Sequence, residues 1–161
     1  LAFARGPGSY TALRITASFL KAIAEVKKLP LIAISNLESI ANEAMHWIDE
    51  DKAIVLVTIE ADVKESYFCS YKKNKDQFLS KEEESIVGMD VLLELLDKDG
   101  CYFAGTGWPD DVINHPKFLS NAIGSAESVA LLARRNLETH ASFLPENANP
   151  VYLKTPEYNK T

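Results

Sequence analysis

The sequence has few of the features that mark membrane, secreted or metal-binding proteins. No apolar run approaches the about 20 residues that a transmembrane helix needs, and no signal peptide is visible. Only two cysteines occur among the 161 residues, Cys69 and Cys101, and neither has a second cysteine or a histidine at ligand spacing. We therefore expect two reduced thiols in a core, in a cytoplasmic α/β protein that does not contact a membrane.

Basic residues are the minority and form no stripe. The chain has 17 lysines and arginines against 23 aspartates and glutamates, a formal net charge of −6. A protein that holds nucleic acid by itself normally presents a basic face that neutralises phosphates. The basic groups here are short and have acidic neighbours, so solvated turns and helix faces are the favoured interpretation. They are Lys72, Lys73, Lys75, Arg134 and Arg135.

Histidines and carboxylates show no pattern of a metal site. Glu43 and His46 have the Glu-x-x-His spacing of carboxylate-bridged metal centres, but no carboxylates from other helices are patterned to complete one. A solvated helix end is the favoured interpretation. His115 and His140 are expected in loops, where a lone histidine is normally only polar. We predict no metal.

The sequence also lacks a catalytic set. Asp110 and Asp111 are adjacent, so their side chains do not converge on one atom, and capping a helix is the favoured role. Ser9 lacks the Gly-x-Ser-x-Gly context of a nucleophile elbow. We predict no catalytic residue and no cofactor.

The first residues form the most distinctive junction of the chain. The apolar run Leu1–Ala4 is typical of one strand in a buried sheet, whose partner strands we expect to lie outside this sequence. Glycines around a proline then permit a sharp turn before a helix that Ser9 or Thr11 can cap. No Gly-Lys-Ser/Thr ending follows, so no nucleotide site is predicted. The predicted structural turn and cap consist of Gly6, Pro7, Gly8 and Ser9.

The predicted helix over 9–28 has an unusually wide apolar surface. Its polar residues fall on one narrow stripe, which leaves roughly two-thirds of the circumference apolar or small, against the about 100° of an ordinary surface helix. Such a helix needs cover on two sides. Its own sheet supplies one, and a missing N-terminal helix or a partner subunit supplies the other; a central core helix fits the pattern equally well. The stripe is Arg14, Ser18, Lys21, Glu25 and Lys28.

Two apolar seams flank this stripe. One has small residues that permit close approach of another helix, and we expect it to meet a partner. The other is bulkier, and we expect it to pack on the sheet. The first seam is Leu13, Ala17, Leu20 and Ala24, and the second is Ile15, Phe19, Ala22 and Val26.

The remaining pattern predicts an α/β chain in two parts. The charged segment 49–52 separates a strand–helix–strand–helix unit from longer β runs, so we place an N-terminal lobe remainder at 1–50 and a C-terminal lobe at 51–161. The predicted strands are 1–5, 30–35, 53–60, 65–73, 77–79 and 101–104. The predicted helices are 9–28, 36–47, 89–96 and 125–139, with an extended tail after them.

Five segments resemble the bacterial tRNA threonylcarbamoyladenosine biosynthesis proteins of the TsaB family. The first is Gly-Pro-Gly-Ser-Tyr-Thr-Ala-Leu-Arg-Ile at 6–15, and the last is Pro-Val-Tyr-Leu-Lys at 150–154. Between them lie 30–37, 60–67 and the Gly-x-Gly-Trp-like segment 104–108. Their order and spacing extend across nearly the whole chain. The family's first strands and first helix have no counterpart here, and departures from its pattern occur at Ala12, Thr16, Glu60, Asp62 and Lys154.

The resemblance implies an actin-like architecture of the sugar kinase/Hsp70/actin type with two lobes, the first of them incomplete. It further implies a non-catalytic partner of the paralogue TsaD in threonylcarbamoylation of the adenosine beside the anticodon of tRNA. The expected partners are a TsaD-like paralogue in a heterodimer and a TsaE-like ATPase in a larger complex, with a homodimer when the protein is alone. Contact with tRNA would then be only indirect.

Two other classes stay open at this point. One is an active enzyme of the actin-like fold, a phosphotransferase or a glycoprotease, with acidic metal-holding residues outside this sequence. The other is a homodimeric structural module, which differs only in which chain covers the helix.

Overall fold

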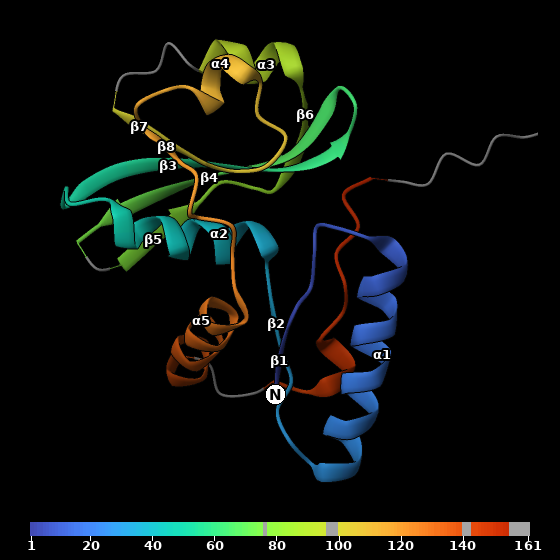
Figure 1. Ribbon diagram of the computed structural model, residues 1–161. Helices are drawn as coiled ribbons and strands as arrows, with labels where there is room; N and C mark the ends of the chain where they lie inside the picture. Colours follow the sequence, from blue (N-terminus) through green and yellow to red (C-terminus); the bar gives the residue numbers. More distant parts are fainter. Residues whose placement is uncertain (76, 96–99, 140–142, 155–161) are drawn as a thin grey trace, which may run out of the picture.

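The computed structural model describes residues 1–75, 77–95, 100–139 and 143–154, and it arranges them around two sheets (Figure 1). The strands are β1 (Ala2–Ala4), β2 (Ile32–Ile34), β3 (Lys52–Asp62), β4 (Glu65–Asn74), β5 (Gln77–Lys81), β6 (Ser85–Gly88), β7 (Cys101–Gly105) and β8 (Phe118–Leu119). The helices are α1 (Tyr10–Lys27), α2 (Asn36–Ala44), α3 (Met89–Glu94), α4 (Asp110–Ile113) and α5 (Ala126–Thr139), with 3-10 turns η1 (Met45–Trp47) and η3 (Pro145–Asn147).

The smaller sheet pairs β1 with β2 in parallel, with Phe3 opposite Ala33. Figure 1 shows the two strands between α1 and α5. On the α1 side, Phe3 shares a buried cluster with Ala17 of the helix. On the α5 side, Ile34 packs with Leu132. A parallel pair covered by helices on both faces explains why these short strands are almost wholly apolar.

The larger sheet has six strands in the order β5-β4-β3-β7-β8, and β6 pairs with β4. Its central strand β3 alternates its side chains between two cores. Val55 and Val57 pack with residues of α2, among them Leu37, on one face. Leu56 packs with Leu92 of α3 and other apolar residues on the opposite face. The apolar run in β3 is therefore that of a strand buried on both sides.

The chain passes between the two sheets more than once. Helix α2, from the first 50 residues, covers the larger sheet, whereas α5 returns to cover the smaller one. The strands of each sheet thus lie on one side of residue 50, whereas a helix that covers each sheet comes from the other side. The lobe boundary near this residue stays a prediction.

Most long elements lie where the periodicity places them. The predicted helix 9–28 is α1, which ends at Lys28 in the left-handed conformation with φ 52°. The strands predicted at 53–60 and 65–73 are β3 and β4. Cys69 and Cys101 are buried free thiols, which confirms that prediction. Three short elements, β6, α4 and β8, were not predicted.

None of the helices among the described residues combines the length and the apolar character that crossing a bilayer requires.

Candidate functional site

A sharp turn sets the position of α1. Gly6 has φ 107°, in the left-handed region that favours glycine, and a Cβ there would lie 3.0 Å from the carbonyl oxygen of Val151. Ser9 is the N-cap of α1, and its hydroxyl accepts a hydrogen bond from the Ala12 N–H at 3.5 Å. The turn therefore fixes where α1 begins and brings residues near the end of the chain against it.

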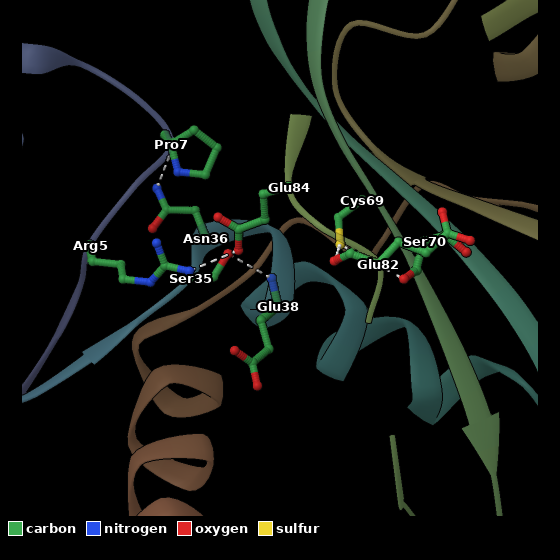
Figure 2. Close-up of polar contacts among 9 residues, drawn as sticks. All are labelled: Arg5, Pro7, Ser35, Asn36, Glu38, Cys69, Ser70, Glu82 and Glu84. Carbon is green, nitrogen blue, oxygen red and sulfur yellow. Dashed lines mark hydrogen bonds and ion pairs between the residues drawn. The ribbon is translucent and has the colours of Figure 1, made fainter. Parts of the chain in front are cut away.

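Figure 2 shows that polar contacts join this turn to α2 and to the larger sheet. Asn36 Nδ2 at the start of α2 donates a hydrogen bond to the Pro7 carbonyl at 3.0 Å. Arg5 Nη2, just after β1, lies 3.0 Å from Glu84 Oε1, just before β6, and the two side chains are only 18% and 7% exposed. The base of α1 is thus tied to both sheets.

The seam that we predicted for a partner is instead buried inside the chain. Leu13, Ala17 and Ala24 are 7%, 3% and 0% exposed, and Leu20 is half-buried. The small side chains at positions 17 and 24 let α1 approach Phe3 of the sheet closely. Leu13, Ala17 and Ala24 are therefore not available to a partner in this fold, because their side chains pack inside the chain.

The second seam, which we predicted to pack on the sheet, faces outward. Ile15, Phe19 and Val26 are 65%, 64% and 78% exposed, and Ala22 between them is exposed as well. Their spacing of four, three and four residues places them on one side of the helix. We call Ile15, Phe19, Ala22 and Val26 the outer face of α1. An exposed apolar stripe of this kind makes the outer face a candidate interaction site.

Two residues of the polar stripe of α1, Arg14 and Lys21, contact the tail of the chain. Arg14 Nε donates a hydrogen bond to the Tyr152 hydroxyl at 3.1 Å, and the Arg14 guanidinium lies 3.9 Å from the centroid of the Tyr10 ring. Lys21 Nζ donates to Asn149 Oδ1 at 2.6 Å. This use of the stripe was not predicted from the sequence. The spacing of Arg14 and Lys21 indicated a shared face, but nothing in the sequence pointed to the tail as what lies on it.

The same tail reaches the hairpin between β3 and β4. Lys154 Nζ lies 2.8 Å from Glu65 Oε2 and 3.0 Å from Asp62 Oδ2. Hydrogen bonds to Glu65 and then to Asp62 raise the pKa of Lys154 above its usual range. A hydrogen bond from the Val63 N–H, followed by the contact with Lys154, lowers the pKa of Asp62. Both groups therefore stay charged over the whole neutral range.

The candidate metal residues are not brought together. Glu43 accepts a hydrogen bond from the Ser125 hydroxyl, while His46 lies exposed in η1. His115 Nδ1 accepts a hydrogen bond from the Lys117 N–H at 3.2 Å. His140 lies outside the described residues. Within the described ranges, no group of three or more His, Cys, Asp and Glu side chains gathers in a way that could hold a metal ion.

Asp110 and Asp111 occupy the first turn of α4, where negative charges interact favourably with the positive end of the helix dipole. The capping position itself belongs to Pro109, so the expectation that an aspartate caps this helix is wrong. These residues have a structural role that requires no substrate.

A family model described as TsaD, tRNA N6-adenosine threonylcarbamoyltransferase, matches residues 1–130. The chain belongs to this family. Curated relatives confirm the resemblance to TsaB: the tRNA threonylcarbamoyladenosine biosynthesis protein TsaB of Escherichia coli K12 is 29% identical over 163 residues, which cover 96% of this chain and 70% of that protein. The TsaB protein of Haemophilus influenzae is 32% identical over 116 residues, covering 67% of this chain but only 48% of the relative.

Solved structures agree with the sequence relatives. YeaZ from Pseudomonas aeruginosa matches with a TM-score of 0.77 at 25% identity, over 94% of this chain and 72% of that one. An uncharacterized protein from the same organism, described as similar to the peptidase YeaZ, matches with a TM-score of 0.76 at 26% identity, over 95% and 72%. The family match and these neighbours confirm the predicted α/β, actin-like fold class.

Proposed function

We propose that this chain acts in threonylcarbamoyladenosine biosynthesis on tRNA as a non-catalytic subunit that docks a partner through the outer face of α1. The observation that carries the proposal is the exposure of Ile15, Phe19 and Val26 on one side of a helix whose other seam is already buried. Leaving three large apolar side chains in water is unfavourable, and a partner that covers them recovers that free energy.

The partner that fits is a TsaD-type paralogue. The TsaB names of the relatives and the TsaD description of the family model support a role beside such a protein. A helix on the paralogue would lie along α1 and pack into the small gap at Ala22 between the larger side chains. In the absence of this partner, a second copy of the chain would cover the same face and give a homodimer. A TsaE-type ATPase would join the heterodimer in a larger complex.

The non-catalytic role rests on how the candidate groups are used. Glu43 and His115 are engaged in hydrogen bonds of the fold, and Asp110 and Asp111 lie in the first turn of α4. We therefore expect the purified chain to hydrolyse ATP and cleave peptides only at background rates, and the paralogue to supply the catalytic groups. An activity of the purified chain that one substitution in it abolishes would contradict this role.

The docking proposal is tested with Phe19→Glu and the TsaD-type protein of the same organism. Titration calorimetry should show a loss of affinity of at least about 30-fold, because the introduced carboxylate would be buried without a counter-charge. Leu137→Glu is the matched control, since Leu137 is 48% exposed on α5 and lies outside the outer face. Circular dichroism should show that both variants fold.

Sedimentation of the chain alone completes the test: wild type and Leu137→Glu should be dimeric, and Phe19→Glu monomeric. Normal binding of the TsaD-type protein by Phe19→Glu would show that the outer face is not the docking site.

A further inference from the structure

The segment 145–154, which we call the strap, runs along α1 after the chain has left α5 (Figure 1). The N-terminal end of the strap is fixed by Lys21, whose Nζ donates to the Glu146 carbonyl at 3.2 Å and to Asn149 Oδ1 at 2.6 Å. Ala148, between these contacts, is buried in the cluster that includes Ala17 and Ala24 of the helix. The strap therefore packs on α1 as well as bonding to it.

The middle of the strap contacts the first turns of α1. The Tyr152 ring lies 4.7 Å from the Tyr10 ring, and Arg14 bonds the Tyr152 hydroxyl while lying over the Tyr10 ring. The Val151 N–H donates to the Arg5 carbonyl at 2.9 Å. A tyrosine pair with an arginine over it is a compact, directional contact.

The C-terminal end of the strap, at Lys154, is held by the larger sheet. Lys154 bridges Asp62 and Glu65, which flank the turn of the hairpin between β3 and β4. The strap thus runs from the C-terminal half of α1, past the first turns of this helix, to the larger sheet. It adds a link between α1 and the larger sheet, beside the contacts of Arg5 and Asn36 and the packing of α2.

We propose that the strap is a positioning element, which holds α1 in the orientation that its outer face needs for docking. This inference rests on the docking function proposed above. The physical reason is that the strap contacts α1 at three places along its length, at Arg14, at Lys21 and at the buried Ala17 and Ala24, and so limits how the helix can move. These contacts lie on the polar stripe and the buried seam of α1, and they leave the outer face open.

The contacts that close the strap lie at the surface. The side chains of Lys154 and Asp62 are 37% and 60% exposed, and the bonds of Arg14 and Lys21 are exposed as well. Exposed ion pairs and hydrogen bonds are individually weak, so the part of the strap that follows the buried Ala148 should open before either core does. Opening it would loosen α1 without unfolding the protein.

The test uses the double variant Tyr152→Ala/Lys154→Gln in the full chain. Hydrogen exchange followed by mass spectrometry should show α1 amides exchanging at least about 10-fold faster, with β3 amides unchanged. Affinity for the TsaD-type protein should fall about 10-fold. Tyr152→Ala/Lys154→Arg should recover part of both losses, because arginine keeps the charge that bridges the hairpin. Lys64→Gln is the control, since Lys64 lies on the same hairpin and outside the strap.

Each result decides the inference. Unchanged exchange in α1 would overturn it, and so would faster exchange with unchanged affinity, because the strap would then not position the docking helix. A global loss of protection that includes β3 would also overturn it, since the strap would be only a general stabiliser. If Phe19→Glu binds normally, the docking function fails by itself, and the exchange of α1 still decides whether the strap holds the helix.

Discussion

Arg5 and Glu84 form an ion pair that joins the end of β1 to the segment before β6, 79 positions later in the chain. Both side chains are largely removed from water, with Glu84 only 7% exposed. A charge in such a place is tolerated only when it is paired, so neither residue can be neutralised alone without cost. Arg5 directly precedes the turn that starts α1, so the pair ties the beginning of the candidate docking helix to the larger sheet.

Arg5→Met should destabilise the protein by about 2–3 kcal/mol, because it leaves the Glu84 carboxylate buried without its counter-charge. The cost should stay below that of a fully buried pair, since Arg5 retains 18% exposure. Urea unfolding followed by circular dichroism measures it. Lys28→Met is the matched control: its pair with Glu25 is 80% and 64% exposed, so the change should be within about 0.5 kcal/mol. Equal effects of the two variants would refute the prediction.

Gly105→Ala should be among the most damaging single substitutions. Gly105 has φ 94°, and a Cβ there would lie 2.0 Å from the backbone carbonyl oxygen of Thr58, which cannot move without disturbing the ladder of β3. We expect a loss of more than about 3 kcal/mol or failure to fold. Gly100→Ala separates conformation from contact, because Gly100 also has positive φ, 82°, but open space around it. It should lose only about 1–2 kcal/mol, the cost of left-handed backbone. A stable Gly105→Ala protein would contradict this account.

The regular elements could be predicted because their periodicity matches their burial. The apolar run of β3 and the repeat in α2 are determined by which faces the cores cover. The short strands β6 and β8 could not be predicted in this way. They are strands because β4 and β7 offer them an edge, and such pairing is decided by tertiary contacts rather than by four or two residues of local sequence.

The candidate site was predicted as a helix but with its seams exchanged. The pattern predicts two apolar seams and a polar stripe on α1. The seam with the small side chains is the one expected to meet a partner helix, because small residues permit close approach. Ala17 and Ala24 instead permit α1 to lie close on Phe3, while Phe19 is left outside. Close approach between a helix and its own sheet needs small residues as much as close approach between two helices does. Sequence alone does not tell which surface uses them.

Tyr102 should titrate near pH 12, well above the pKa of about 10 of an ordinary tyrosine. Its hydroxyl donates a 2.6 Å hydrogen bond to Glu50 Oε1, and that bond, with burial and the nearby carboxylates, raises the pKa of Tyr102 to about 12. The folded chain then holds a proton that the unfolded chain loses near its usual pKa of about 10. The stabilising effect is therefore complete below about pH 10 and is lost as the pH rises through 12.

Absorbance titration at the tyrosinate band tests this, by subtracting the curve of Tyr102→Phe from that of the wild type. The difference should have its midpoint near pH 12. A midpoint near pH 10 would mean that the bond to Glu50 does not form in solution. Glu50→Gln should move the midpoint downward, since the charged acceptor is the largest cause of the raised pKa.

The chain alone should bind tRNA only in the range of nonspecific contacts, about 10⁻⁴–10⁻⁶ M, and more weakly as salt rises. Its net charge is −6, and several of its basic groups are already engaged: Lys73 donates to the Ile48 carbonyl, Arg135 to Asn42, and Arg134 lies near Glu138. If the TsaD-type partner supplies the phosphate-binding surface, fluorescence anisotropy should show tight binding only with both proteins present. Submicromolar, salt-resistant binding by this chain alone would instead reveal an RNA site of its own. Lys72→Ala and Lys75→Ala would then be the first variants to locate it, because neither side chain forms an ion pair within the part of the chain that the structure describes.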